Sequence, residues 1–334
     1  MSASASPPGS ELRAIVAPYT RADRRRSFFQ LATSLSLFIA VCAAAYAVYP
    51  TSWLLSLALA VPAGGLLLRL FSIQHDCTHG SFFASRRANV WAGRLCSLLT
   101  VTPFLGWSRL HLLHHAQWND LQRGDLADIF SACLTVREYR ALPRGRRLLY
   151  RLPRHPLMSI VLLPPLIFAL ILRLPLDTPR SLVNEHRSFH LTNLALAGLY
   201  GALALVLGWE PVLVVQLPAV AIASIFGCWV LTVHHHFDRA CWRPPETWDY
   251  VEASLAGSSW LAAPKIVHWL TGNLAIHHVH HLNTRIPNYH LAEASTALQA
   301  RWPTEQVSLK SALAAPWLTL WDEEAGRLVG FRQA

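Results

Sequence analysis

Three groups of histidines are the residues of this chain whose types and spacing could do chemistry. His75 and His79 stand four residues apart, so on a helix both imidazoles would lie on one face. Two further groups repeat an HxxHH pattern, and they consist of His111, His114 and His115, and of His277, His280 and His281. In each trio, two histidines share a helix face and an immediate neighbour can reach a second metal ion. The pattern predicts metal binding, because uncompensated imidazoles beside apolar segments would be costly.

The type and number of these ligands indicate which metal they bind. Imidazole suits zinc, copper, iron and nickel. A zinc ion takes three or four protein ligands, whereas these eight histidines exceed the capacity of one ion and fit two ions with open positions for oxygen. A pair of iron ions is therefore the best account. The histidines without partners at ligand spacing are not expected to bind metal, and they are His155, His186, His190, His268 and His290.

The segments around the three groups read HDCTHGSFF from His75, HLLHH from His111 and HHVHHLNTRIPNYHL from His277. They resemble the three histidine boxes of the membrane fatty acid desaturases. The segment SLAGSSWLAAPKIVHWLTGNLAIHHVHH is similar to bacterial acyl-lipid desaturases in particular. The resemblance covers residues 74–298, about two-thirds of the chain, and the three boxes together form a specific signature.

The resemblance also implies a ninth metal ligand, at the end of the last apolar run. The segment VHHHFDRACW, residues 233–242, is similar to the family's VQHxFED segment and has His235 at the matching position. His234 stands where relatives usually have glutamine, and His236 follows directly. Either neighbour is an alternative to His235 as the ligand.

Three further side chains are candidates for orienting the metal ligands. Acidic neighbours can orient imidazoles by accepting their second N–H. Asp76 lies within the first box, and Asp128 matches the aspartate of the family's GDIW segment. Structurally known relatives place an asparagine near the site through water, and Asn273 is the candidate for that role here.

The resemblance implies an oxygen-dependent fatty acyl desaturase, which introduces a double bond into a lipid-linked acyl chain at a di-iron centre. An apolar tunnel would hold the flexible alkyl chain against the metals. The sequence contains no haem-ligating HPGG segment, no cysteine set for an iron–sulfur cluster and no glycine-rich dinucleotide fingerprint. Electrons are therefore expected from an external ferredoxin, flavodoxin or cytochrome b5-type donor.

Two other functions share part of this pattern. A membrane hydroxylase or ketolase on an alkyl or carotenoid substrate would use the same di-iron chemistry but return oxygen to the substrate. A histidine-rich metal transporter would place its ligands within spans along a polar path, whereas here the histidines lie beyond the ends of apolar runs. The GSFF and NYHL flanks favour desaturation by resemblance.

The elements that position these histidines are predicted to be membrane-spanning helices. The 334 residues are 53% hydrophobic and 14% charged, and the mean hydropathy is +0.29. So few charges cannot cover a soluble surface of this size. Several apolar runs approach or exceed the length that crosses about 30 Å of hydrocarbon. These runs are residues 28–49, 53–73, 157–172, 191–209 and 211–233.

The histidine groups limit how many of these runs can cross. If all five spanned, the first and last groups would lie on opposite faces of the membrane. The run 157–172 is the shortest, contains Pro164 and Pro165, and has arginines on both sides, so we predict a re-entrant or interfacial segment. Four spans remain, in two hairpins. The weaker stretch 90–105 is expected to be an interfacial or core-packed helix, and a six-span alternative would recruit it.

The arginines predict how the protein is oriented. The net charge is +10, and arginines cluster at residues 21–26 and 137–154 beside apolar runs. This positive-inside pattern places the N-terminus, the 137–154 loop and everything after residue 233 in the cytosol. Anionic lipid headgroups, not nucleic acid, are the expected counterpart. The protein is thus expected in the cytoplasmic (inner) membrane, multi-pass, with its active site facing the cytosol.

The predicted fold is an all-α integral membrane fold, with four transmembrane helices in two hairpins, interfacial helices and a cytosolic helical cap that carries the histidine boxes. The expected organisation is a disordered basic N-terminal tail at residues 1–27, a membrane desaturase domain at 28–300 and a C-terminal cytosolic tail at 301–334. The six cysteines are scattered singly and are expected to be reduced.

Overall fold

The structure is a computed structural model that describes residues 9–122, 130 and 132–334. Most of these residues lie in helices. Four helices are long and apolar enough to cross a membrane. They are α2 (Arg24–Val48), α3 (Trp53–His79), α9 (Val183–Leu207) and α10 (Trp209–His235). The prediction of a mostly helical membrane protein with four long apolar helices is confirmed.

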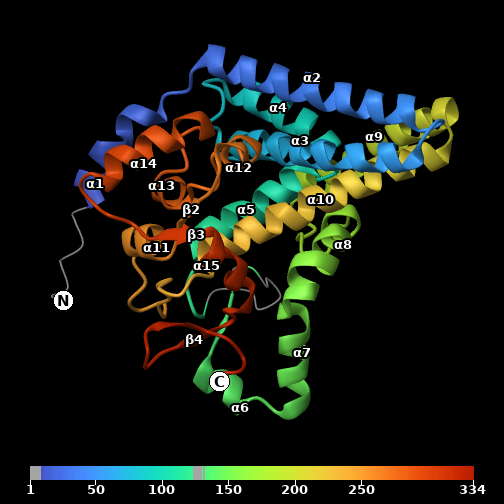
Figure 1. Cartoon of the computed structure of the whole chain (residues 1–334). Helices are drawn as coiled ribbons and strands as arrows, with labels where there is room; N and C mark the ends of the chain where they lie inside the picture. Colours follow the sequence, from blue (N-terminus) through green and yellow to red (C-terminus); the bar gives the residue numbers. More distant parts are fainter. Residues whose placement is uncertain (1–8, 123–129, 131) are drawn as a thin grey trace.

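The long helices are joined in pairs by very short connections. A three-residue turn, Tyr49 to Thr51, precedes Ser52, whose side chain caps α3 by accepting from the backbone N–H of Leu55. Gly208, with φ of 86°, separates α9 from α10. Figure 1 shows α2, α3 and α10 running alongside one another, with the short elements of the C-terminal half gathered at one end.

Small residues bring α3 and α10 into close contact. A Cβ added to Gly64 of α3 would come 2.9 Å from the carbonyl oxygen of Ala219 in α10 and 2.8 Å from Ile222. Close backbone approach of this kind is typical of helix pairs in membranes. This packing fixes the position of the C-terminal end of α3 relative to the C-terminal end of α10.

The region predicted to be interfacial is broken into short helices. The stretch 90–105 is divided between α4 (Arg86–Leu99) and α5 (Phe104–Gln117), with Pro103 at the N-cap of α5. The run 157–172 contains a π-helical segment, Leu157–Leu162, then α8 (Leu163–Ala169) and the 3-10 turn Ile171–Arg173. It is bent by 48° from α7 (Arg144–Arg154). The bent pair amounts to a fifth span only if its two parts are counted as one.

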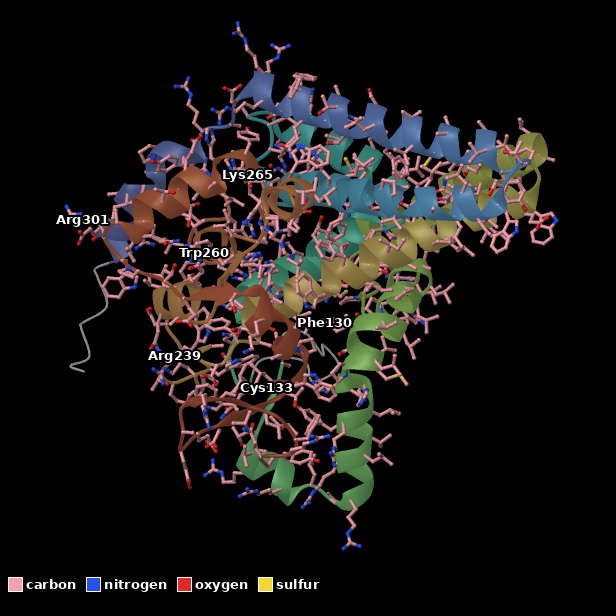
Figure 2. The ribbon with its side chains drawn as sticks, viewed as in Figure 1. Phe130, Cys133, Arg239, Trp260, Lys265 and Arg301 are labelled. Atoms are coloured by element: carbon pink, nitrogen blue, oxygen red, sulfur yellow. The ribbon has the colours of Figure 1, made fainter. Side chains whose placement is uncertain are left out.

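Short elements complete the chain around the end of the long helices that carries histidines. The helices are α6 (Val136–Ala141), α11 (Tyr250–Ala256), α12 (Lys265–Leu270), α13 (His277–Leu282), α14 (Leu291–Gln299) and α15 (Leu309–Ala314), with 3-10 turns at Asn288–His290 and Ala315–Trp317. Figure 2 shows Trp260 and Lys265 within this group of short elements.

Two small sheets were not predicted from the sequence. One contains β1 (Leu134–Thr135), β4 (Leu320–Asp322) and β5 (Arg327–Val329), and the other contains β2 (Trp260–Ala262) and β3 (Gln306–Ser308). Strands β2 and β3 are parallel, as are β1 and β4. Strands of two or three residues are too short for an alternating pattern to reveal them.

Both ends of the chain pack more closely than the predicted tails. Residues 1–8 lie outside the described part, but α1 (Gly9–Val16) and the 3-10 turn Ala17–Thr20 follow. Leu12 and Val16, four residues apart in α1, are 1% and 0% exposed in a cluster with Leu298 of α14. The expected disorder of residues 1–27 therefore does not hold from residue 9 onwards, because two apolar side chains on one helix face bury themselves. Near the C-terminus, Val307 is buried with Val233 of α10.

Candidate metal centre

Four helices bring the predicted ligands together. His75 and His79 lie in the last two turns of α3, and His235 is the last residue of α10. The trio that begins at His111 lies near the end of α5, and the trio that begins at His277 makes up half of the short helix α13. Because α3 and α10 end at the same side of the molecule, the sequence-distant histidines meet there (Figure 1).

The nine histidines form two groups, each compact enough to hold one metal ion. Within each group the closest ring nitrogens all lie within 4.8 Å of one another. The five-histidine group contains His75, His79, His111, His115 and His280. The four-histidine group contains His114, His235, His277 and His281. No acidic side chain belongs to either group among the residues that the structure describes.

The HxxHH spacing divides each trio between the two groups. His111 and His115, one helical turn apart in α5, share the five-histidine group, while His114 turns to the other. In α13 the assignment is reversed, since His277 and His281 share the four-histidine group. Two positions on one helix face thus serve one group, and their neighbour serves the other.

The distances between ring nitrogens fit metal ions. Nε2 of His111 lies 2.9 Å from Nε2 of His79 and 3.1 Å from Nε2 of His115, and the Nε2 atoms of His277 and His281 are 2.9 Å apart. Two nitrogens bound at a right angle to one ion, each at about 2.1 Å, would lie about 3.0 Å apart. A buried nitrogen without a protein partner also needs a ligand. Nε2 of His75 is such an atom, and none of the described residues bonds to it.

Burial keeps the imidazoles of the short helices in their neutral form. The pKa values of His111, His115, His277, His280 and His281 are all lowered well below the usual 6.5. Desolvation is the main cause in each case, and the neighbouring histidines add to it. Neutral imidazole is the form that binds metals.

The three consecutive histidines at the end of α10 have different surroundings. His235 belongs to the four-histidine group, and its Nδ1 lies 3.2 Å from the carbonyl oxygen of Gly257. His236 has both ring nitrogens against backbone carbonyls, with Nδ1 2.7 Å from the oxygen of Leu318. His234 belongs to neither group, and its ring stacks on His277 with centroids 4.0 Å apart. Of the three alternatives, the geometry favours His235.

Asp76 contacts the five-histidine group from outside. Its Oδ1 lies 3.2 Å from Nδ1 of His75, and its Oδ2 accepts a 2.6 Å hydrogen bond from the backbone N–H of Asn288. This carboxylate is 1% exposed. It can therefore fix the tautomer and the orientation of His75.

Asn273 and Asp128 were the other two candidates for orienting the metal ligands. Asn273 contacts no histidine of either group through a hydrogen bond, and its side-chain amide donates to the carbonyl oxygen of Asn288 at 3.1 Å. It reaches the site only indirectly, through the residue that holds Asp76. Asp128 lies outside the described residues.

The structure adds contacts that the sequence did not reveal. The ring of Trp107 stacks on His111 with centroids 4.7 Å apart at 11°, and Trp118 lies 4.3 Å from His281. Trp107 stands four residues before His111 in α5, a spacing that could have suggested the contact. The histidines expected not to bind metal, His155, His186, His190, His268 and His290, belong to neither group.

Comparisons with known proteins point to one family. The model of the family described as "Fatty acid desaturase" matches residues 50–312. A "Fatty acid desaturase" of Bacillus subtilis (strain 168) is 38% identical over 317 residues, which cover 95% of this chain and 89% of that protein.

More distant relatives carry more specific names. The "sn-1 oleoyl-lipid 12-desaturase" of Synechocystis sp. (strain ATCC 27184 / PCC 6803 / Kazusa) is 27% identical over 252 residues, covering 72% of this chain and 67% of its own length. The "Temperature-sensitive sn-2 acyl-lipid omega-3 desaturase (ferredoxin), chloroplastic" of Arabidopsis thaliana is 28% identical over 275 residues, covering 76% and 59%.

Proposed function

The chain belongs to the fatty acid desaturase family, and from this premise we propose that its nine clustered histidines hold two iron ions. The protein is a membrane oxidoreductase that introduces a double bond into a fatty acyl chain. The observation that carries the iron assignment is the division of the histidines into a group of five and a group of four. All-imidazole sets suit iron, and nine ligands suit two ions better than one.

The reaction oxidises an unactivated alkyl chain, and the bound irons would supply that oxidising chemistry. Two hydrogens leave the acyl chain and, with two electrons and two protons from outside, reduce one dioxygen to two waters. The side chains of the protein have a positional task. Asp76 holds His75 through its Nδ1, and the carbonyl oxygen of Gly257 holds His235 in the same way. The rings of Trp107 and Trp118 pack against the imidazoles of His111 and His281 and limit their rotation.

We propose a lipid-linked acyl chain as substrate and an external protein as electron donor. The names of the Synechocystis and Arabidopsis relatives support an acyl group carried on a lipid. The Arabidopsis name also includes ferredoxin, which supports a ferredoxin, flavodoxin or cytochrome b5-type donor. Helix α7 carries five arginines in eleven residues and no acidic residue. An acidic donor could be steered to this surface by charge.

We propose that the four long helices cross the cytoplasmic membrane as two hairpins, with the metal centre in a cap on the cytosolic face. The end of α3 supplies His75 and His79 to the five-histidine group, and the end of α10 supplies His235 to the four-histidine group. Helices α5 and α13 contribute histidines to both groups, which supports placing the two ends on one side of the membrane. The arginines at the start of α2 and along α7 support the cytosol as that side. We retain residues 28–300 as the desaturase domain, against which α1 and residues 301–334 pack.

Membership of the family favours desaturation over the two alternatives. A hydroxylase or ketolase would share the two histidine groups, so geometry alone does not separate it from a desaturase. A metal transporter would require ligands along a path through the spans, whereas the two groups lie at the ends of α3 and α10 and on α5 and α13.

Expression in a bacterial host without a desaturase of its own tests the function. New monounsaturated acyl chains, detected by mass spectrometry of the membrane lipids, are expected with the wild type and not with His280→Ala. His186→Ala is the matched control, because His186 belongs to neither group and bonds to the carbonyl oxygen of Thr178. Saturated hydroxy acids in place of the double bond would establish the hydroxylase instead.

A further inference from the structure

Arg69 is a buried charge whose role the metal centre does not explain. It lies in the long apolar helix α3 and is 8% exposed. Its Nε donates to Oγ of Ser34 at 3.0 Å, and its Nη1 donates to the carbonyl oxygen of Trp269. The guanidinium carbon also lies 4.2 Å from the centre of the Trp269 ring. Within the part of the chain that the structure describes, no carboxylate forms an ion pair with Arg69.

A positive charge at such a position is costly without an anion. Ionisable side chains within membrane spans are expensive and usually mark a functional site. The partners of Arg69 are a hydroxyl, a carbonyl oxygen and an aromatic face, all of them neutral. They leave its positive charge uncompensated, and Nη2 has no hydrogen bond among the described residues. A bound anion would supply the missing counter-charge.

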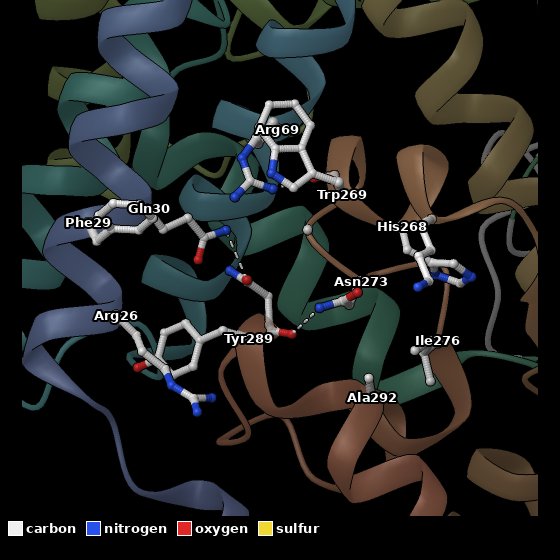
Figure 3. A pocket seen from close by; sticks show the side chains of 13 residues that line it. Arg26, Phe29, Gln30, Arg69, His268, Trp269, Asn273, Ile276, Tyr289 and Ala292 are labelled. Carbon is white, nitrogen blue, oxygen red and sulfur yellow. Dashed lines mark hydrogen bonds between the residues drawn. The ribbon is translucent and has the colours of Figure 1, made fainter.

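Arg69 lines a cavity of about 490 Å³ whose charged residues are all basic. Figure 3 shows Arg69 and Trp269 at one end and Arg26 with Tyr289 at the other. The basic lining residues of the cavity are Arg26, Arg69, Lys265 and His268. Among the described residues, Arg26 forms an ion pair with Glu293 alone, at 3.5 Å, and this pair is weak because both side chains are about half exposed. The lining thus offers cations to an anion and contains no acid that would repel it.

The remaining lining and its place in the fold suit a lipid. Phe29, Trp269 and Ile276 supply apolar surface beside the basic groups. Arg26 lies in the first turn of α2, where a membrane-spanning helix begins. An anionic group with an alkyl chain attached would satisfy both halves of the lining, and an anionic membrane lipid combines the two.

The cavity is also next to the five-histidine group. Arg69 precedes His75 by six residues on α3, which corresponds to about 9 Å along the helix axis. Asn288, which lines the cavity, donates its backbone N–H to Asp76, and Asp76 contacts His75. A headgroup bound here would hold its acyl chains close to the histidines.

We propose that this cavity binds the phosphate group of a phospholipid and so positions the acyl chain that is desaturated. The inference rests on the proposed lipid-linked substrate. Arg69, Arg26 and Lys265 would donate charge-assisted hydrogen bonds to the phosphate oxygens. The apolar side chains would contact the first part of the acyl chain.

The test measures lipid binding directly. Iron-loaded protein in neutral detergent is titrated with a fluorescent phosphatidylglycerol, and a galactosyl diacylglycerol with the same acyl chains is the lipid without phosphate. Arg69→Met could disturb folding, because Arg69 is buried. The variant for the test is therefore the double substitution Arg26→Gln with Lys265→Gln, whose side chains lie at the exposed rim of the cavity.

The matched control removes the same charge elsewhere. Arg24→Gln with Arg301→Gln also lowers the net charge by two, and neither residue lines the cavity; Figure 2 shows Arg301 at the edge of the molecule. We expect the first variant to weaken binding of phosphatidylglycerol about tenfold or more, and the control to change it by less than about twofold. The galactolipid should bind more weakly than phosphatidylglycerol to the wild type.

Several outcomes would overturn the proposal. Equal binding of the two lipids by the wild type would exclude recognition of phosphate. Equal loss of binding in both double variants would reduce the effect to general surface charge. Displacement of the lipid by millimolar inorganic phosphate would assign the cavity to a free anion. Desaturation in the host tests the function separately. If the wild type makes double bonds but the Arg26→Gln, Lys265→Gln variant still binds phosphatidylglycerol normally, the proposal for the cavity is refuted and the desaturase function is not.

Discussion

The contact between Asp76 and His75 allows a quantitative prediction for Asp76→Asn. The substitution keeps the size and shape of a side chain that is 1% exposed, and an amide oxygen can still accept from the backbone N–H of Asn288. It replaces the carboxyl oxygen that lies 3.2 Å from Nδ1 of His75 with an amide N–H group, which cannot accept a hydrogen bond from that ring. The loss of one hydrogen bond costs about 0.5–1.5 kcal/mol. Losing a partner that orients a ligand typically lowers metal affinity by about 10- to 100-fold.

The effect should be confined to one of the two irons. Of the nine histidines, Asp76 bonds to His75 alone, which belongs to the five-histidine group, so the four-histidine group should keep its affinity. We expect that, at a concentration of an iron chelator that leaves two irons in the wild type, Asp76→Asn retains about one iron per chain. Iron is measured by elemental analysis of protein that elutes as a folded monodisperse species.

Gln30→Ala is the control for this prediction. It removes the hydrogen bond that Gln30 donates to the side chain of Asn288 and leaves the contacts of Asp76 with Asn288 and His75 in place, so both irons should remain. Retention of two irons by Asp76→Asn at the wild-type chelator concentration would refute the orienting role. Loss of both irons from a folded variant would refute the division into two separable groups.

Three further predictions follow from the same structure. His235→Ala should lose about one iron per chain by elemental analysis, whereas His236→Ala should retain both, because the ring of His236 bonds to backbone carbonyls; the reverse result would make His236 the ligand. Gly106→Ala should destabilise the protein by about 1–3 kcal/mol in thermal unfolding, because the added Cβ would overlap the ring of Phe189. Gly201→Ala, whose added Cβ would meet no neighbouring side chain or other segment within 4 Å, should not lower the melting temperature, and an equal loss in both variants would contradict this packing. Removal of iron with a chelator should lower the melting temperature, because metal binding stabilises the folded state and its loss leaves buried ring nitrogens without partners; an unchanged melting temperature would count against metal at this site.

Much of the candidate site could be predicted from local sequence because helical spacing is local. A separation of four residues places two histidines on one face of a helix in any fold, as His111 and His115 show. An adjacent histidine points elsewhere, so an HxxHH pattern by itself provides for two ions. The long apolar runs could also be recognised from local sequence. A helix that crosses the membrane satisfies its own backbone hydrogen bonds, so it needs no distant segment to form.

Other features could not be predicted because they depend on contacts between distant segments. Leu12 of α1 looked like part of a disordered tail until its burial against α14 was known. Strands β2 and β3 pair only because residues 260–262 and 306–308 are brought together by the fold. Arg69 was one arginine among many in the sequence, and its unusual position is evident only from its burial and neutral partners.

The sequence by itself determined the chemistry of this protein, because the number, type and spacing of its histidines indicate two metal ions beside membrane spans. The tertiary structure decided which histidines belong to the five-histidine group and which to the four-histidine group. It placed His280 of α13 with the histidines of α3, and His114 of α5 with His235 of α10. The reason is physical: spacing along a helix fixes which way a side chain points, but only the packing of α3, α5, α10 and α13 fixes which side chains from different helices come within reach of one ion.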